Sequence, residues 1–320
     1  MSAVTPGPQQ RLLPNRFLSK PAADDAQEAS VQPDDTRMPD NDTELFLVGA
    51  SELEMGNPVG AAALLERAIA INPDVGVYHA HLGRARKLLD QLDDAVTAFR
   101  RAVALDPDSA EDHFQLGVAL SKNGDYGPST IAAFERAVAL KPIHAAAFHH
   151  LGRALQKSGD LSNAIANYER AVFFDPALAD AHYDLGDAFM QMGAVNAAIA
   201  CFRRAIELAP GLPEPHLNLG RVLAGRGETV AAIDEFRKVV ALDPAPGNWA
   251  ELGNALAAYG GDNESVEICH RLARDRAGLK RLGAGLYREF LQFPLIDELT
   301  FIRGIRDLLL RAWTERCRPV

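Results

Sequence analysis

Histidines recur along this chain at spacings that invite a test for metal chemistry. The sequence has 320 residues and 9 histidines. Four of them stand at regular intervals: His79, His113, His182 and His216. Zinc ligands lie about 2.1 Å from the metal, whereas packed helices are roughly 8–10 Å apart, so rings on successive helices cannot easily share one ion. His149 and His150 are adjacent and would point in different directions on a helix. We therefore expect no metal site, and a packing role for the four spaced rings.

The cysteines and the catalytic motifs give no stronger sign of an active site. The spacing of Cys201, Cys269 and Cys317 matches neither a CxxC pair nor a zinc site. We expect them to be small buried side chains, and their free thiols are typical of a reducing compartment. The chain has no GxxxxGK[ST] loop, no GxSxG elbow, no HExxH and no GxGxxG after an expected strand. The sequence therefore predicts a protein that is not an enzyme and that uses no cofactor.

Composition and charge favour a helical, acidic protein. Hydrophobic residues make up 48% and aromatics 7%, a mix that suits helices packed through small aliphatic side chains. The net charge is -10; residues 271–320 carry 11 Lys and Arg against 6 Asp and Glu, so the rest is near -15. An acidic body disfavours nucleic acid and anionic membranes. With no apolar run near the roughly 20 residues that span a bilayer and no signal-peptide pattern, we expect a cytoplasmic location.

A period of 34 or 35 residues runs through most of the chain. It is marked by Pro73, Pro107, Pro142, Pro176, Pro210 and Pro244. A Leu-Gly pair follows each proline after eight or nine residues, at Leu82-Gly83, Leu116-Gly117, Leu151-Gly152, Leu185-Gly186, Leu219-Gly220 and Leu252-Gly253. A second glycine stands seven residues beyond the first in most copies: Gly56, Gly124, Gly159, Gly193, Gly227 and Gly260. An aromatic follows at Phe99, Phe134, Tyr168, Phe202 and Phe236.

Each landmark has a physical reason in a pair of packed helices. The first glycine lacks a Cβ and lets the partner helix approach closely. The second glycine ends the first helix by adopting a left-handed conformation. The aromatic fills the space between the paired helices, and the proline closes the second helix because it cannot continue it.

This pattern resembles the tetratricopeptide repeat, whose signature is a Leu-Gly pair, an Ala, an aromatic and a Pro at these offsets. The resemblance covers roughly residues 42–279 and implies an all-α, right-handed solenoid of antiparallel helix pairs. We expect seven units, of which the first and last are degenerate: 42–75, 76–109, 110–144, 145–178, 179–212, 213–245 and 246–279. The third holds one extra residue, which we place in its inter-helix turn near Asp125–Ser129.

The flanks differ from the array. Residues 1–41, rich in Pro, Asp and Gln, are expected to be a disordered tail. Residues 280–320 are expected to form a helical cap, since an apolar face recurs at helical spacing over residues 295–313. The alternative for that face is a surface for homo-oligomerisation.

The polar face of each first helix supplies the candidate binding residues. In repeats of this family the first helix lines the concave surface, so the resemblance implies a groove there for a protein or peptide partner. The residues expected to line it are His81, Arg84, Lys87, Gln115, Lys122, His150, Arg153, Lys157, Asp184, Asp187, Asn218, Arg221 and Asn254. The stripe is basic in the second to fourth units, which favours an acidic partner segment; the alternative is an ordinary solvated helix face.

Two functional interpretations follow. The first is a non-catalytic scaffold or adaptor that binds a partner protein, with no role for nucleic acid or membrane. The second is the substrate-recruiting arm of an enzyme, because similar arrays precede the catalytic part of O-linked N-acetylglucosamine transferases, where an asparagine ladder lines the groove. Here only Asn218 occupies a ladder position, and residues 280–320 are too few for a catalytic domain. The Lys and Asn that bind carboxylates in chaperone adaptors are absent from the matching positions.

Overall fold

The computed structural model describes residues 41–260 and shows an all-helical protein over that range. Its thirteen helices there are α1 (Asp42–Glu54), α2 (Pro58–Ile71), α3 (Gly76–Leu88), α4 (Leu92–Leu105), α5 (Ala110–Lys122), α6 (Pro128–Leu140), α7 (Ala145–Ser158), α8 (Leu161–Phe174), α9 (Ala179–Gln191), α10 (Val195–Leu208), α11 (Pro213–Gly225), α12 (Thr229–Leu242) and α13 (Pro246–Tyr259). The expected tail up to residue 40, the cap over 280–320 and the last part of the unit 246–279 lie outside the described residues.

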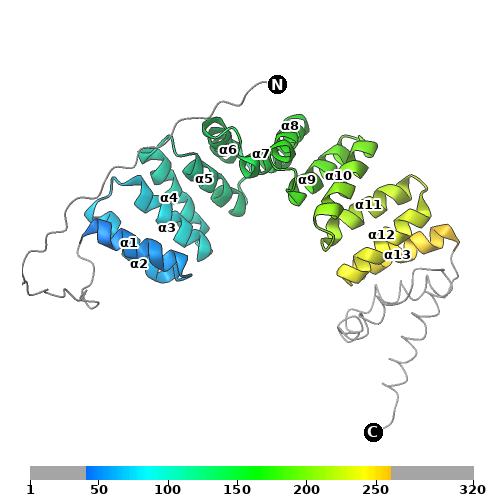
Figure 1. The fold of residues 1–320 in the computed structure, drawn as a ribbon, viewed down its shortest axis with the longest axis horizontal. Helices are drawn as coiled ribbons and strands as arrows, with labels where there is room; N and C mark the ends of the chain where they lie inside the picture. The colour runs from blue at the N-terminus through cyan, green and yellow to red at the C-terminus, as the bar shows by residue number, and fades with distance from the viewer. Residues whose placement is uncertain (1–40, 261–320) are drawn as a thin grey trace, which may run out of the picture. The chain divides into compact units, whose positions relative to one another are not determined.

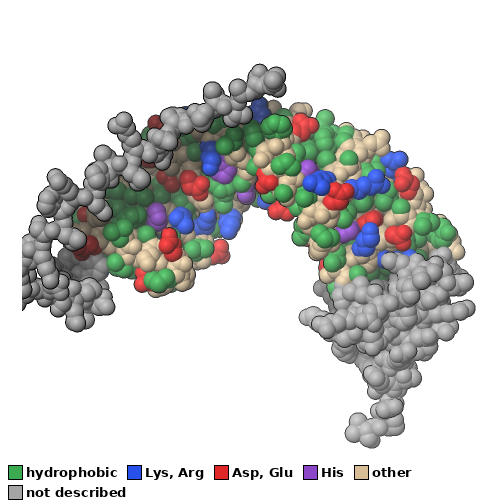
Figure 2. Space-filling model, in the orientation of Figure 1, with side chains coloured by type: hydrophobic (Ala, Val, Ile, Leu, Met, Phe, Trp, Pro, Cys, Tyr) green, Lys and Arg blue, Asp and Glu red, His purple; other side chains and the backbone are tan. Residues whose placement is uncertain are grey.

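The helices pack in the order of the chain (Figure 1). Each odd-numbered helix from α1 to α11 packs most extensively on the even-numbered helix that follows it, and each pair then contacts the next pair. The odd-numbered helices α1, α3, α5, α7 and α9 also contact one another in succession. The first helices of neighbouring units therefore share one surface, which confirms the predicted α-solenoid class. Charged side chains of both signs lie among apolar ones on the face seen in Figure 2.

A glycine and an aromatic ring interlock inside five of the helix pairs. A Cβ placed on Gly186 of α9 would lie 2.7 Å from the ring of Phe202 on α10. The other pairs are Gly83 with Phe99, Gly117 with Phe134, Gly152 with Tyr168 and Gly220 with Phe236. All five rings are buried, at 0–2% exposure. The glycine of each Leu-Gly pair is therefore the point where the backbone of the first helix approaches the aromatic ring of the second.

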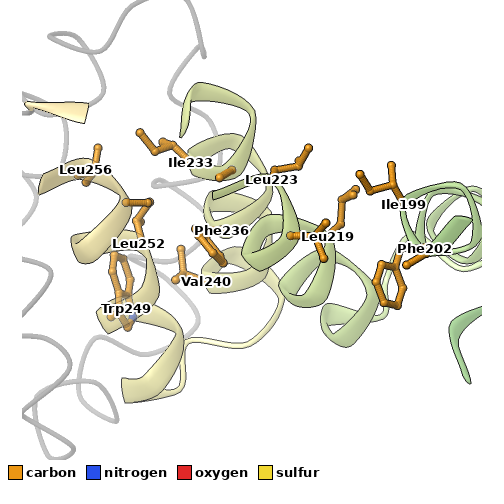
Figure 3. Packing of buried hydrophobic residues seen from close by; sticks show 14 residues of the cluster. Ile199, Phe202, Leu219, Leu223, Ile233, Phe236, Val240, Trp249, Leu252 and Leu256 are labelled. Atoms are coloured by element: carbon orange, nitrogen blue, oxygen red, sulfur yellow. The ribbon is translucent and has the colours of Figure 1, made fainter. Parts of the chain in front are cut away.

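Apolar packing continues from one unit to the next. One core cluster joins residues of α10, α11, α12 and α13. Figure 3 shows Leu219 and Leu223 of α11 between Phe202 and Phe236, with Leu252 of α13 beyond. Because each unit packs mainly on its neighbours, its stability depends on them.

The second glycine of the period ends the first helix, as predicted. All six such glycines have a positive φ, between 76° and 93°. In the second unit Asp90 takes this position with φ 59°, the one non-glycine residue of the described range with a positive φ. The extra residue of the third unit lies in the α5–α6 connection, residues 123–127. The helices are thus separated by sharp turns that make each pair antiparallel.

The interlock predicts a stability difference between two glycine-to-alanine changes. Gly186→Ala should lower the free energy of unfolding by about 1–3 kcal/mol, because the new methyl group collides with Phe202. Gly225→Ala, in α11, meets nothing within 4 Å and should keep or raise stability by up to about 1 kcal/mol. Urea unfolding followed by circular dichroism measures both. Equal stability of the two variants would contradict the interlock.

Candidate partner-binding surface

The candidate residues lie on the first helices α3, α5, α7, α9, α11 and α13, and we call the surface they form the first-helix face. Arg84, Lys122, Arg153, Lys157, Arg221 and Asn254 are exposed. The others are partly buried: His81, Lys87, Gln115, His150, Asp184, Asp187 and Asn218. The structure spreads these residues over six units, so they do not converge on one compact site.

Three cations of the second and third units lie close enough to repel one another. Burial lowers the pKa of Lys87, and the nearby charges of Lys122 and Arg84 lower it further, opposed by Glu111. The Lys87 ammonium donates a hydrogen bond to Gln115, whose amide in turn donates to Glu111 over 2.6 Å. Within residues 41–260, none of the three cations forms an ion pair. We call Arg84, Lys87 and Lys122 the basic cluster.

Two arginines farther along the face lie near acids of the next unit. Asp184 on α9 accepts a hydrogen bond from His149 over 2.7 Å and lies 3.6 Å from Nε of Arg153. Arg221 on α11 pairs with Glu251 on α13, with a closest distance of 2.7 Å. Lys157 on α7, like the basic cluster, forms no ion pair with a described residue, so the unpaired positive charge of the face lies on α3, α5 and α7.

Polar links that the sequence analysis missed join successive first helices. Gln156 on α7 donates to Asp187 on α9 over 2.8 Å, and accepts a hydrogen bond of 2.7 Å from the hydroxyl of Tyr168. The amide of Asn218 lies 3.3 Å from the hydroxyl of Tyr183, one unit earlier. Partners 31 to 35 residues apart, about one period, are the signal that could have revealed them. These links order the face and remove some of its polar groups from ligand binding.

His150, which was predicted to be part of the basic stripe, is held between aromatic rings. Its ring centroid lies 5.5 Å from that of Phe114 and 5.6 Å from that of Phe134. Burial lowers the pKa of His150 to about 4, helped by the charges of His149 and Arg153 and opposed by Asp184. The ring is therefore neutral at pH 7 and adds no positive charge to the face.

The regularly spaced histidines close the turns between units. Nε2 of His79 lies 2.8 Å from the carbonyl oxygen of Pro73, and the rings of His113 and His182 contact Pro107 and Pro176 in the same way at 3.1 Å. A carbonyl can only accept, so each ring donates and fixes the turn six residues before it. His216 differs, because it pairs with Glu235 over 2.6 Å.

The cysteine thiol and the possible metal ligands of the described range were predicted from the sequence to have structural roles. Burial raises the pKa of the Cys201 thiol to about 11, so it is not a nucleophilic thiolate at neutral pH. Cys269 and Cys317 lie outside the described residues. Between residues 41 and 260, no three His, Cys, Asp or Glu side chains are grouped to hold a metal ion. None of the described helices is both long and apolar enough to cross a membrane.

Comparison with known proteins agrees with this architecture. The family model for the TPR repeat matches residues 83–124, 152–193 and 186–227. PilW, a widely conserved type IV pilus biogenesis factor, is similar in structure with a TM-score of 0.57 and 21% identity, over 67% of this chain and 98% of that one. PilF of Pseudomonas aeruginosa gives 0.57 and 17%, over 68% of this chain and 96% of that one. YrrB, a TPR protein with an unusual peptide-binding site, gives 0.51 and 20%, over 61% and 97%.

At these identities the structural likeness establishes the fold alone. No curated protein matches the sequence. The described array is an α-solenoid of tandem helix pairs with a Leu-Gly, aromatic and proline period. Residues 83–124, 152–193 and 186–227 of this array are tetratricopeptide repeats.

The environment of His150 predicts a loss of stability in acid. Its pKa is about 4 in the folded chain and about 6.5 when unfolded, so between these values the unfolded chain binds a proton that the folded chain does not. The resulting penalty is absent above pH 6.5 and grows as the pH falls toward 4. Between pH 7.5 and 4.5 the chain should lose about 2 kcal/mol more stability than its His150→Gln variant. Urea unfolding at both pH values measures this; equal losses would show that His150 is not buried neutral.

Proposed function

We propose that this protein is a non-catalytic scaffold that binds a segment of a partner protein along the first-helix face. An acidic part of that segment would lie at the basic cluster. The repeat family supports protein binding in general, because its arrays present extended surfaces to partners. The acidic preference goes further and depends on the charges of the face.

The observation that carries the acidic preference is the basic cluster itself. Arg84, Lys87 and Lys122 bring three positive charges together without a carboxylate paired to any of them in the described range. Lys87 is also half-buried, which disfavours its charged form. A carboxylate bound beside it would relieve both the repulsion and the cost of burial. Each exposed pair contributes only about 0.2–1 kcal/mol, so several acids along the segment are required for useful affinity.

The rest of the face suggests the direction of the segment. From α7 onward Arg153 and Arg221 already have acidic neighbours, and Asp184 and Asp187 add negative charge. Acidic side chains are therefore favoured beside α3 and α5, and neutral or hydrogen-bonding ones beside α9 and α11. A partner with acids at one end and polar residues at the other fits this distribution.

The first-helix face does not favour the alternative function, a substrate-recruiting arm of an enzyme. Asn218, the one asparagine at a ladder position, is already engaged with the hydroxyl of Tyr183. We place the scaffold in the cytoplasm because the free thiol of Cys201 suits a reducing compartment. Homo-oligomerisation through residues 295–313 remains a proposal, because those residues lie outside the described range.

Charge reversal at the basic cluster tests the acidic preference. The double variant Arg84→Glu with Lys122→Glu should bind a fluorescein-labelled Glu-rich peptide at least tenfold more weakly, because two attractive pairs become repulsive. Fluorescence anisotropy at low and physiological salt measures the affinity, which should fall with salt in the unmodified chain. A Lys-rich peptide serves as the negative probe.

The matched control is Arg100→Glu, which reverses an exposed cation on the second helix α4 of the same repeat. It changes the net charge but leaves the first-helix face intact. Its affinity for the Glu-rich peptide should therefore change less than twofold. An equal loss in the control and the cluster variant would show that overall charge, and not this cluster, attracts the peptide.

A further inference from the structure

A second groove lies on the other side of the array, between the second helices α6 and α8. It has a volume of about 740 Å³, and α7 forms part of its wall through Phe148, Leu151 and Leu155. At 100° per residue these side chains lie on the opposite face of α7 from His150, Arg153 and Lys157. The groove is therefore separate from the first-helix face.

Three aromatic side chains line this groove, with Phe148 buried at its base and Phe173 and Phe174 forming an aromatic rim. Phe174 stacks on Phe148 with ring centroids 5.6 Å apart, and Phe173 meets Phe174 edge-on at 5.3 Å. Phe173 is 77% exposed, the highest value among the large hydrophobic side chains of the described range. Exposing a phenylalanine this far gains nothing for folding, so packing within the chain does not explain it.

The other units show that this aromatic rim is specific to the fourth. Phe173 stands three residues before Pro176, where the matching residues before the other prolines are Ala70, Ala104, Ala139, Glu207 and Ala241. Phe148 stands where three other units have the histidines that bond the proline carbonyl, and it stacks on Phe174 instead. Both departures meet in one groove, although they lie on different helices and 25 residues apart in the sequence.

The same unit also lacks a partner for its arginine. In the second and third units the equivalent arginines pair with the aspartate after the preceding proline: Arg101 with Asp74 over 2.7 Å, and Arg136 with Asp108 over 2.9 Å. In the fifth, Arg204 pairs with Glu207 three residues later, also over 2.9 Å.

Arg170 has neither of these partners. Ile143 occupies the place of the aspartate, and Phe173 occupies the place of the glutamate. Arg170 forms no ion pair with any described residue, and its guanidinium carbon lies 5.6 Å from the centre of the Phe148 ring. Arg170 is itself exposed and lines the same groove as Phe173, so its charge is complementary to a carboxylate that approaches with an apolar group.

We propose that the groove between α6 and α8 is a second docking site, which binds a protein segment carrying a large apolar side chain next to a carboxylate. The apolar side chain packs among Phe148, Phe173 and Phe174, and the carboxylate pairs with Arg170. Glu135 also lines the groove and repels an anion on its own side, which directs the carboxylate to Arg170. A scaffold with this site and the first-helix face can hold two segments at once.

Selection from a random heptapeptide phage library on the full chain tests the proposal. Among the enriched peptides, those that bind in the groove between α6 and α8 should carry Leu, Ile or Phe beside Asp or Glu. Synthetic versions should bind at least tenfold more weakly to Phe173→Glu, which recreates the spacing of Arg204 and Glu207, and to Ile143→Asp, which recreates the partner of Arg101. Both changes supply Arg170 with an internal carboxylate, at exposed positions where folding should persist, as circular dichroism would verify.

The matched control is Arg204→Glu, which alters the equivalent arginine of the next unit and should leave the affinity unchanged. Arg84→Glu with Lys122→Glu should also leave it unchanged, so failure here and failure of the first-helix proposal are distinguishable. The proposal is overturned if no enriched peptide loses affinity in the two groove variants, or if the enriched peptides are basic. It is also overturned if sedimentation shows that Phe173→Glu dissolves a dimer, since the groove would then be an interface between copies.

Discussion

Every complete unit from the second to the sixth depends on the contact between a glycine of its first helix and an aromatic ring of its second. The nearest ring atom would lie only 2.6–2.9 Å from a Cβ added to the glycine, which is too close for any side chain there. The two helices therefore pack as closely as the ring between them allows. This contact fixes the distance within each pair, and apolar clusters that cross from one pair to the next fix the stack. These contacts occupy the buried interior of each unit. The residues that differ from unit to unit therefore lie on the surfaces.

The fold could be read from the sequence because steric requirements recur at a fixed period. The close approach and the left-handed turn each require glycine, and the space between the paired helices requires an aromatic ring. The structure ends α7 at Gly159 and α13 at Gly260, two glycines of the predicted period. One exception is instructive. Asp90 adopts the left-handed conformation without glycine, so a glycine-only pattern misses the turn of the second unit.

The candidate surface was less readable, because charge on a helix face says nothing about its partner in space. Arg153 looks as available in the sequence as Arg84, yet only Arg153 has an aspartate of the next unit nearby. His150 looks basic, yet two phenylalanine rings enclose it and it is neutral at pH 7. The groove at Phe173 is hidden for the same reason, since it depends on residues of different helices that become neighbours only in the stack.

In the proposed complex, an acidic segment binds the basic cluster on α3 and α5. Acetylation of lysines followed by mass spectrometry, with and without the Glu-rich peptide, tests it directly on the full chain. The peptide should protect Lys87 and Lys122, while Lys141, at the end of α6, and Lys238, on α12, react as before. Equal protection of all four lysines, or none at Lys87 and Lys122, would contradict it.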